Sequence, residues 1–171
     1  MPLRRRAVHP LSHKIRSQAW LVRQLRRRHP RSSIVFTNGC FDLLHVGHIS
    51  LLEQARELGD VLVVGLNSDR SVRALKGPTR PIVTQQDRAR VLAALKSVDY
   101  VTIFNARTPL ALITALKPNV LVKGADWGRG EIVGRRVVER HGGRVVRVPL
   151  KAGHSTTRLV QRLRRAAPRA R

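Results

Sequence analysis

The chain alternates short apolar runs with helical segments between residues 34 and 166, and this alternation restricts the possible folds more than any other feature. Strands are predicted within 34–38, 60–69, 100–104, 119–124 and 144–150, and helices within 48–59, 84–98, 108–118, 130–143 and 155–166. Strands that alternate with helices at this spacing form a parallel sheet covered on both faces. The sequence therefore predicts an α/β fold of one domain, with a five-stranded parallel sheet and helices on both faces.

A further helical segment, LSHKIRSQAWLVRQLRRR, precedes the first strand at residues 11–28. Its apolar residues recur near helical spacing, so it predicts an amphipathic helix with a basic outer face, which Pro30 ends. Such a helix can lie on a membrane surface, but docking on the domain's own core is favoured. We therefore divide the chain into a basic N-terminal helix or arm at 1–31, the main domain at 32–166 and a basic tail at 167–171.

The composition excludes several classes of protein. No apolar stretch approaches the ~20 residues of a membrane span, and no apolar segment of a signal peptide follows the first arginines. One cysteine, Cys40, cannot form a disulfide within the chain, which fits a reducing compartment. We expect a cytoplasmic protein with an aliphatic core.

The formal net charge of +24 lies mostly in the flanks of the chain. All ten acids fall within residues 42–139, where 14 Lys and Arg leave a net charge of only +4; residues 1–41 and 140–171 carry ten basic residues each. Arg-rich solvated surfaces are favoured over an arm that binds polyanions, because only Trp20 offers an aromatic ring near the basic runs. Nucleic-acid binding through the flanks is possible but not favoured.

Polar segments follow four of the five predicted strands, at 38–48, 67–69, 123–128 and 153–157. Parallel open sheets bind ligands at the carboxyl ends of their strands, near the point where the strand order reverses. Four polar segments at one edge of the sheet therefore predict a ligand site there.

The first of these segments, NGCFDLLHVGH, places His45 and His48 around Gly47 where a strand gives way to a helix. Two side chains at i and i+3 share a helix face, and the glycine allows a ligand to approach the backbone. Free N–H groups at the helix start favour phosphate. A zinc site lacks further ligands, and two purely structural histidines are less favoured at such a turn, so the pattern favours phosphate chemistry.

The other polar segments are compatible with phosphate but less specific. Lys76 and Arg80 in LKGPTRP can fold over a polyphosphate or belong to an exposed loop, and Arg88 can reach a phosphate or lie on the surface. Lys123 ends a buried strand, a costly place for a charge without a purpose. The chain has neither a Walker A loop nor a Gly-x-Gly-x-x-Gly fingerprint, and Cys40 is a turn residue rather than a nucleophile.

Taken in order, VFTNGCFDLLHVGH, VVGLNSD, LKGPTRPI, LVKGADW and HSTT resemble the cytidylyltransferase-like nucleotidyltransferases, which have a Rossmann-like fold. Within them, the motifs are most similar to the D-glycero-β-D-manno-heptose 1-phosphate adenylyltransferases, and the resemblance covers roughly residues 14–165. It implies that a sugar 1-phosphate oxygen attacks the α-phosphorus of ATP, assisted by Mg²⁺, giving ADP-heptose and pyrophosphate. That reaction demands positioning and charge neutralisation rather than a strong base.

The resemblance also implies roles for individual residues. His45 and His48 would contact the phosphates and stabilise the transition state, and Lys76 and Arg88 would hold phosphate oxygens. Asp42 would orient His45 or position Mg²⁺. The sugar-phosphate side would be lined by Asn67, Asp69 and Arg80. The implied nucleotide-binding residues are Thr37, Asn38, Gly39, Cys40, Phe41, Asp42, Gly47, Lys123, Gly124, Asp126, Ser155, Thr156 and Thr157.

The sequence departs from this family at Gln86, where many relatives have an acid. It departs again at Ala125, which precedes Asp126 here, whereas relatives often have Gly-Asp after the strand lysine and glycine. Some relatives are fused to a sugar kinase, and we expect a separate kinase chain to supply the sugar 1-phosphate here. A homo-oligomer is expected. Two alternatives stay open: a cytidylyltransferase acting on glycerol 3-phosphate or a similar small phosphate, and, less favoured, a nucleic-acid-binding module on the same fold.

Overall fold

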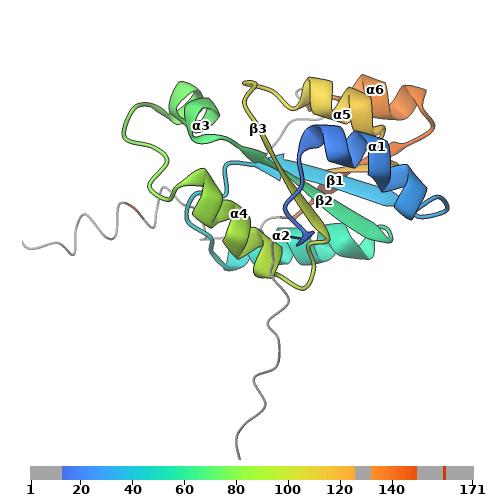
Figure 1. Ribbon diagram of the computed structural model, residues 1–171, viewed down its shortest axis with the longest axis horizontal. Coiled ribbons are helices and arrows are strands. Elements are labelled where there is room, and N and C mark those ends of the chain that lie inside the picture. The colour runs from blue at the N-terminus through green and yellow to red at the C-terminus, as the bar shows by residue number, and fades with distance from the viewer. Residues whose placement is uncertain (1–12, 126–131, 150–159, 161–171) are drawn as a thin grey trace, which may run out of the picture.

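A computed structural model describes residues 13–125, 132–149 and 160 of the chain. Five strands form one sheet in the order β3-β2-β1-β4-β5, and every neighbouring pair is parallel (Figure 1). This arrangement confirms the predicted fold class. The strands are β1 Ile34–Gly39, β2 Val61–Asn67, β3 Tyr100–Phe104, β4 Val120–Gly124 and β5 Arg144–Val148.

Helices cover both faces of the sheet, because alternate strand residues are apolar on both sides (Figure 1). α2 and α4 pack on the face that contains Val35, Leu62 and Val64. α1, α5 and α6 pack on the opposite face, over Ile34, Phe36 and other residues. The helices are α1 Gln18–Arg28, α2 Val46–Glu57, α3 Asp69–Lys76, α4 Gln85–Ala94, α5 Leu110–Leu116 and α6 Arg135–Arg140. No helix within the described ranges is long and apolar enough to cross a membrane.

The N-terminal helix docks on the sheet, as the favoured alternative predicted. Leu21 and Leu25 of α1 are fully buried in the core of that face. The segment before the helix lies along the outer edge of β3, where Arg16 N donates to the Val101 carbonyl (2.9 Å) and Val101 N donates to the Lys14 carbonyl (2.9 Å). This pairing covers an exposed sheet edge, so α1 is part of the folded domain.

Some element boundaries differ from the prediction for local reasons. α1 begins at Gln18 rather than at residue 11, because Ser17 caps it by accepting from Trp20 N (3.2 Å) and the preceding residues pair with β3. α3 was not predicted, and the strand expected through residue 69 ends at Asn67; Ser68 caps this eight-residue helix by accepting from Ser71 N (3.2 Å). α4 ends at Ala94 instead of 98 because Leu95 is extended. The helix predicted at 155–166 lies, apart from Val160, outside the described residues.

Candidate active site

The strand order reverses between β1 and β4, which places a candidate site at the carboxyl ends of these two strands. Their paired register covers only Val35 with Val120 and Phe36 with Leu121. Beyond it, side chains connect the strands: Thr37 Oγ1 donates to the Val122 carbonyl (3.1 Å), and Lys123 Nζ donates to Asn38 Oδ1 (2.5 Å). Lys123 is thereby held, with 9% of its surface exposed, at the end of β4.

The turn after β1 depends on Gly39 and Phe41. Phe41 has a left-handed backbone (φ +44°), and its ring is buried beside Gly39. A Cβ on Gly39 would lie 3.1 Å from that ring, so a larger residue would push the ring away. The Phe41 ring also meets the His48 ring edge-on, with 5.2 Å between ring centres. The glycine therefore allows Phe41 to support His48 from behind.

His45 and His48 stack on one another at the start of α2. Their ring centres are 3.9 Å apart and the rings are inclined by 22°. His45 is the N-cap residue with an extended backbone, and His48 lies in the first turn, so the spacing places both on one side as predicted. Burial, and next the neighbouring His45, lowers the pKa of His48 to about 4. His48 is consequently a neutral imidazole near pH 7 and offers one N–H donor.

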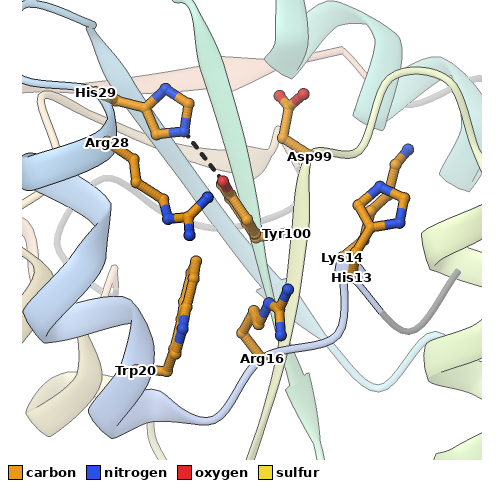
Figure 2. Close-up of a pocket in the computed structure, with 8 residues that line it drawn as sticks. All are labelled: His13, Lys14, Arg16, Trp20, Arg28, His29, Asp99 and Tyr100. Atoms are coloured by element: carbon orange, nitrogen blue, oxygen red, sulfur yellow. Dashed lines mark hydrogen bonds between the residues drawn. The ribbon is translucent and has the colours of Figure 1, made fainter.

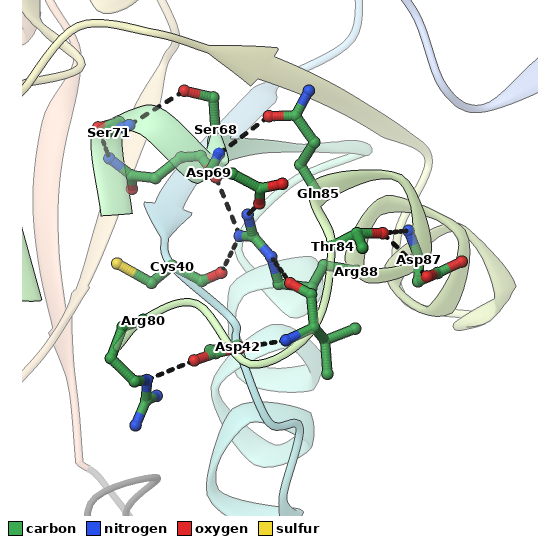
Figure 3. Close-up of polar contacts among 12 residues, drawn as sticks. Cys40, Asp42, Ser68, Asp69, Ser71, Arg80, Thr84, Gln85, Asp87 and Arg88 are labelled. Atoms are coloured by element: carbon green, nitrogen blue, oxygen red, sulfur yellow. Dashed lines mark hydrogen bonds and ion pairs between the residues drawn. The ribbon is translucent and has the colours of Figure 1, made fainter. Parts of the chain in front are cut away.

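The carboxylate of Asp42 is committed to the segment that follows α3. It is buried, and it accepts from Arg80 Nε (2.5 Å; Figure 3). It also accepts from Ile82 N (2.8 Å) and Val83 N (3.0 Å). Asp42 therefore fastens residues 80–83 against the β1 turn, and Arg80 is its ion-pair partner.

The predicted Mg²⁺ ligand role of Asp42 does not fit this arrangement, because both carboxylate oxygens already have donors from the protein. Within residues 13–125, 132–149 and 160, no group of three or more His, Cys, Asp or Glu side chains can hold a metal ion. Mg²⁺ can also be held largely by substrate phosphates and water, so its participation stays a prediction.

Arg88 lies in the interior rather than on the surface or facing the site. Only 1% of it is exposed, and its guanidinium donates to the carbonyls of Cys40, Asn67 (2.9 Å) and Val83 (2.9 Å) (Figure 3). The guanidinium also forms an ion pair with Asp69 (2.7 Å). These donors connect the ends of β1 and β2 with α3 and the segment before α4, and the contact of Arg88 with phosphate oxygens stays a prediction.

The residues predicted to line the sugar-phosphate side also make internal contacts. Asn67 is buried, and its Nδ2 donates to Ser71 Oγ (2.9 Å), which in turn donates to the Ala106 carbonyl (2.9 Å). Asp69 pairs with Arg88 but keeps about a quarter of its side chain exposed. Ser68 and Ser71 of this network were not singled out from the sequence, although a serine directly after a strand is a preferred N-cap residue of a helix.

Further charges surround Cys40 at the end of β1. Burial raises the pKa of the Cys40 thiol, and the nearby charges of Lys76 and Arg88 partly oppose that effect. Lys76 is exposed at the end of α3, so this cation lies near the turn without being fixed in the interior. The predicted residues Asp126, Ser155, Thr156 and Thr157 lie outside the described residues.

The geometry combines a stacked histidine pair at a helix start, of which His48 is neutral, with lysines and polar turns at the switch point of a parallel sheet. A cytidylyltransferase-like family model matches residues 36–162, about three quarters of the chain. The chain belongs to the cytidylyltransferase-like family. This membership confirms the resemblance drawn from the motifs, and the matched range contains all the predicted site residues.

Relatives of this cytidylyltransferase-like chain carry the name bifunctional protein HldE. The protein from Koribacter versatilis is 61% identical over 142 residues, and that from Syntrophotalea carbinolica is 53% identical over 142 residues. Each alignment covers 83% of this chain but 29% of the relative, so the chain spans less than a third of their length.

Two solved structures have a similar fold. The lipopolysaccharide core biosynthesis protein from Thermoplasma volcanium superposes with a TM-score of 0.58 at 28% identity, over 70% of this chain and 97% of that one. A pantoate–β-alanine ligase from Francisella tularensis superposes with a TM-score of 0.57 at 17% identity, over 84% and 68% of the two chains, which is evidence for the fold alone.

Proposed function

We propose that this protein is an adenylyltransferase that transfers AMP from ATP to a sugar 1-phosphate, with D-glycero-β-D-manno-heptose 1-phosphate as the substrate and ADP-heptose and pyrophosphate as products. The observation that carries the proposal is the stacked pair of His45 and His48 at the start of α2, which follows the carboxyl end of β1, the strand that Lys123 of β4 contacts through Asn38. Identity of 53–61% to proteins named HldE supports the choice of sugar substrate.

The reaction is an in-line displacement at phosphorus. An anionic oxygen of the sugar phosphate forms a bond to the α-phosphorus of ATP, and the bond from that phosphorus to the bridging α–β oxygen breaks. Pyrophosphate leaves with the bonding electron pair. The attacking oxygen carries no proton at neutral pH, so no general base is needed, and the protein has to hold the two anions together.

His48 suits this task because its neutral imidazole donates a hydrogen bond without carrying a charge. A neutral His48 offers an N–H to a phosphate oxygen, and His45 stands beside it over the helix start, whose free N–H groups also favour anions. Donors aimed at oxygens that gain charge during transfer stabilise the transition state. Lys123 and the exposed Lys76 would add positive charge near the triphosphate.

Mg²⁺, when bound with ATP, would neutralise charge on the leaving pyrophosphate. The described carboxylates offer it no prepared site, so every role above is assigned to side chains of the protein. The sugar 1-phosphate requires a prior kinase reaction, for which we propose a separate chain. Cytoplasmic location and a homo-oligomeric state belong to the same proposal.

The test is pyrophosphate release measured with ATP or CTP against heptose 1-phosphate or glycerol 3-phosphate. We expect release with ATP and heptose 1-phosphate and little with the other pairs. Release with CTP and glycerol 3-phosphate alone would replace the proposal with the cytidylyltransferase alternative. No release with any pair, together with tight and steeply salt-dependent binding to nucleic acid, would favour the binding-module alternative.

Histidine variants connect the activity to the site. His45→Ala and His48→Ala should each lower turnover by about 10²-fold or more, the scale of losing one transition-state donor. His141→Ala is the matched control, because His141 is exposed at the end of α6, away from the switch point, and should leave turnover unchanged. Undiminished turnover in both site variants would remove the catalytic role of the pair.

A further inference from the structure

A second polar pocket lies at the opposite end of the sheet from the histidine pair. It encloses about 260 Å³ and is bounded by residues before and at the end of α1 and by the first residue of β3 (Figure 2). We call it the Trp20 pocket; its lining residues are His13, Lys14, Arg16, Trp20, Arg28, His29, Asp99 and Tyr100. Because β1 and β3 run in the same direction, the start of β3 and the carboxyl end of β1 lie at opposite ends of the strands. This pocket is therefore separate from the candidate active site.

Two guanidinium groups gather on one aromatic ring in the Trp20 pocket. The central carbon of Arg16 lies 4.6 Å from the centre of the Trp20 ring, and that of Arg28 lies 5.2 Å from it (Figure 2). Tyr100 lies 5.7 Å from Trp20 between ring centres. Both guanidinium groups therefore lie over the same ring, and an anion bound beside that ring would compensate their positive charge.

The pocket's other charged groups do not neutralise these two arginines. Asp99, the sole carboxylate in the lining, accepts from Leu62 N (2.8 Å) and pairs with Arg56 (3.3 Å). Across the described part of the chain, neither Arg16 nor Arg28 pairs with a carboxylate. Arg16 Nε is buried, and no described atom accepts its hydrogen bond.

Lys14 has a structural task, since its Nζ donates to the carbonyls of Leu95 (3.1 Å) and Val98 (2.7 Å) after α4. Arg26, in the same basic run as Arg28, is likewise engaged, with the Lys117 carbonyl (3.0 Å) and Asn119 Oδ1 (3.0 Å). Unlike Lys14 and Arg26, these two arginines have no side-chain hydrogen bond to another described residue, so their donors are available to a ligand in the pocket.

We infer that the Trp20 pocket binds a nucleoside phosphate, with the phosphate held by Arg16 and Arg28 and the planar base against Trp20 and Tyr100. Guanidinium groups bind phosphate oxygens in pairs, and aromatic faces bind bases. A bounded volume of about 260 Å³ suits a small ligand better than a nucleic-acid strand, which would follow an extended basic groove. This inference does not depend on the reaction proposed for the histidine site.

The chain offers a direct reporter, because it contains only two tryptophans. In a Trp127→Phe variant, fluorescence comes from Trp20 alone, and the probes are ADP, pyrophosphate, adenosine and a single-stranded RNA oligonucleotide. We expect ADP to change the fluorescence saturably, pyrophosphate to bind more weakly and adenosine to have no effect. ADP bound only at the histidine site leaves this signal unchanged, which would overturn the inference.

Charge-matched variants complete the test. In the Trp127→Phe background, Arg16→Gln and Arg28→Gln should each weaken ADP binding by about tenfold, the scale of losing a hydrogen bond to a charged group. Arg27→Gln is the control, because this neighbouring arginine is exposed and does not line the pocket, and its effect should stay within about twofold. Equal losses of ADP affinity in all three variants would indicate diffuse charge attraction and would overturn the inference.

Arg28 is exposed at the end of α1, so its replacement tests the inference even where the Arg16 variant folds poorly. RNA that binds far more tightly than ADP, and that ADP cannot displace, would assign the pocket to a nucleic-acid strand and refute a nucleotide site.

Discussion

Replacing Arg88 with methionine tests whether this residue connects parts of the fold or contacts phosphate. Its guanidinium is 1% exposed and donates to three carbonyl groups and to the carboxylate of Asp69. Methionine fills a similar volume but donates nothing. The three carbonyls would lose their charged donor, and the partly exposed Asp69 would keep its charge without a partner.

The cost can be estimated from these contacts. Breaking a buried ion pair by removing one partner costs about 3–5 kcal/mol. Asp69 keeps a quarter of its side chain exposed, so water partly compensates and the lower end of that range applies to the pair. Loss of the hydrogen bonds to three carbonyls adds to that cost, so the total loss in the free energy of unfolding is roughly 3–5 kcal/mol. This is a large share of the roughly 5–15 kcal/mol by which a typical domain is stable.

The assay is equilibrium urea unfolding followed by circular dichroism. With a slope of about 1–3 kcal/mol per molar urea, the Arg88→Met midpoint should fall by about 2 M. Arg90→Met is the matched control, because Arg90 lies exposed on the same helix and should change stability by less than about 0.5 kcal/mol.

Activity separates the two roles of Arg88. If Arg88 connects the strand ends, turnover per folded molecule should fall much less than stability suggests. A variant that unfolds at the midpoint of the parent chain but loses about 10²-fold in turnover would refute the argument and restore the phosphate role.

Three further perturbations follow from the described contacts. The pKa of His48 in the folded protein (about 4) is below its usual value of 6.5, so between pH 4 and 6.5 the unfolded chain binds more protons than the folded one. The contribution of His48 to the free energy of unfolding should therefore be fully present above pH 6.5. It should fall by about 1–2 kcal/mol, after allowance for solvent screening, as the pH drops to 4. His48→Gln should remove that share of the pH dependence in urea titrations, and an unchanged profile would contradict the burial of the ring. Gly65→Ala should cost about 1–3 kcal/mol in the same assay, because the new Cβ would lie 2.7 Å from the Phe36 ring, and a double-mutant cycle with Phe36→Leu should show coupling; additive effects would argue against the contact. Cys40, the single cysteine, should react with iodoacetamide at pH 8 at least about tenfold more slowly than in the urea-unfolded chain, because burial raises its pKa; equal rates by mass spectrometry would show an accessible thiol.

The sequence by itself determined which segments form the strands and most of the helices. Apolar runs of five to seven residues separated by amphipathic segments can be buried only as a covered parallel sheet, so the fold class followed from local pattern. The histidine pair followed in the same way, since its i and i+3 spacing at a strand-to-helix turn places both rings on one face wherever the helix packs. Helix capping also depends on local sequence. α3 was nevertheless missed, although Ser68 is a recognisable N-cap residue.

The tertiary structure decided which partner each polar side chain has. Arg88 and Asp42 were expected to face phosphate or metal, yet both contact residues that are distant in the chain. The partners of Asp42 lie 38 to 41 residues away. Those of Arg88 lie 19 to 48 residues away, except for the nearby Val83. A charged residue near a site looks the same in sequence whether it contacts a ligand or satisfies carbonyls at strand ends. The difference arises only when the sheet order brings those carbonyls together, because a buried guanidinium must be satisfied by whichever acceptors surround it. The Trp20 pocket arose likewise, from the docking of α1 beside the start of β3.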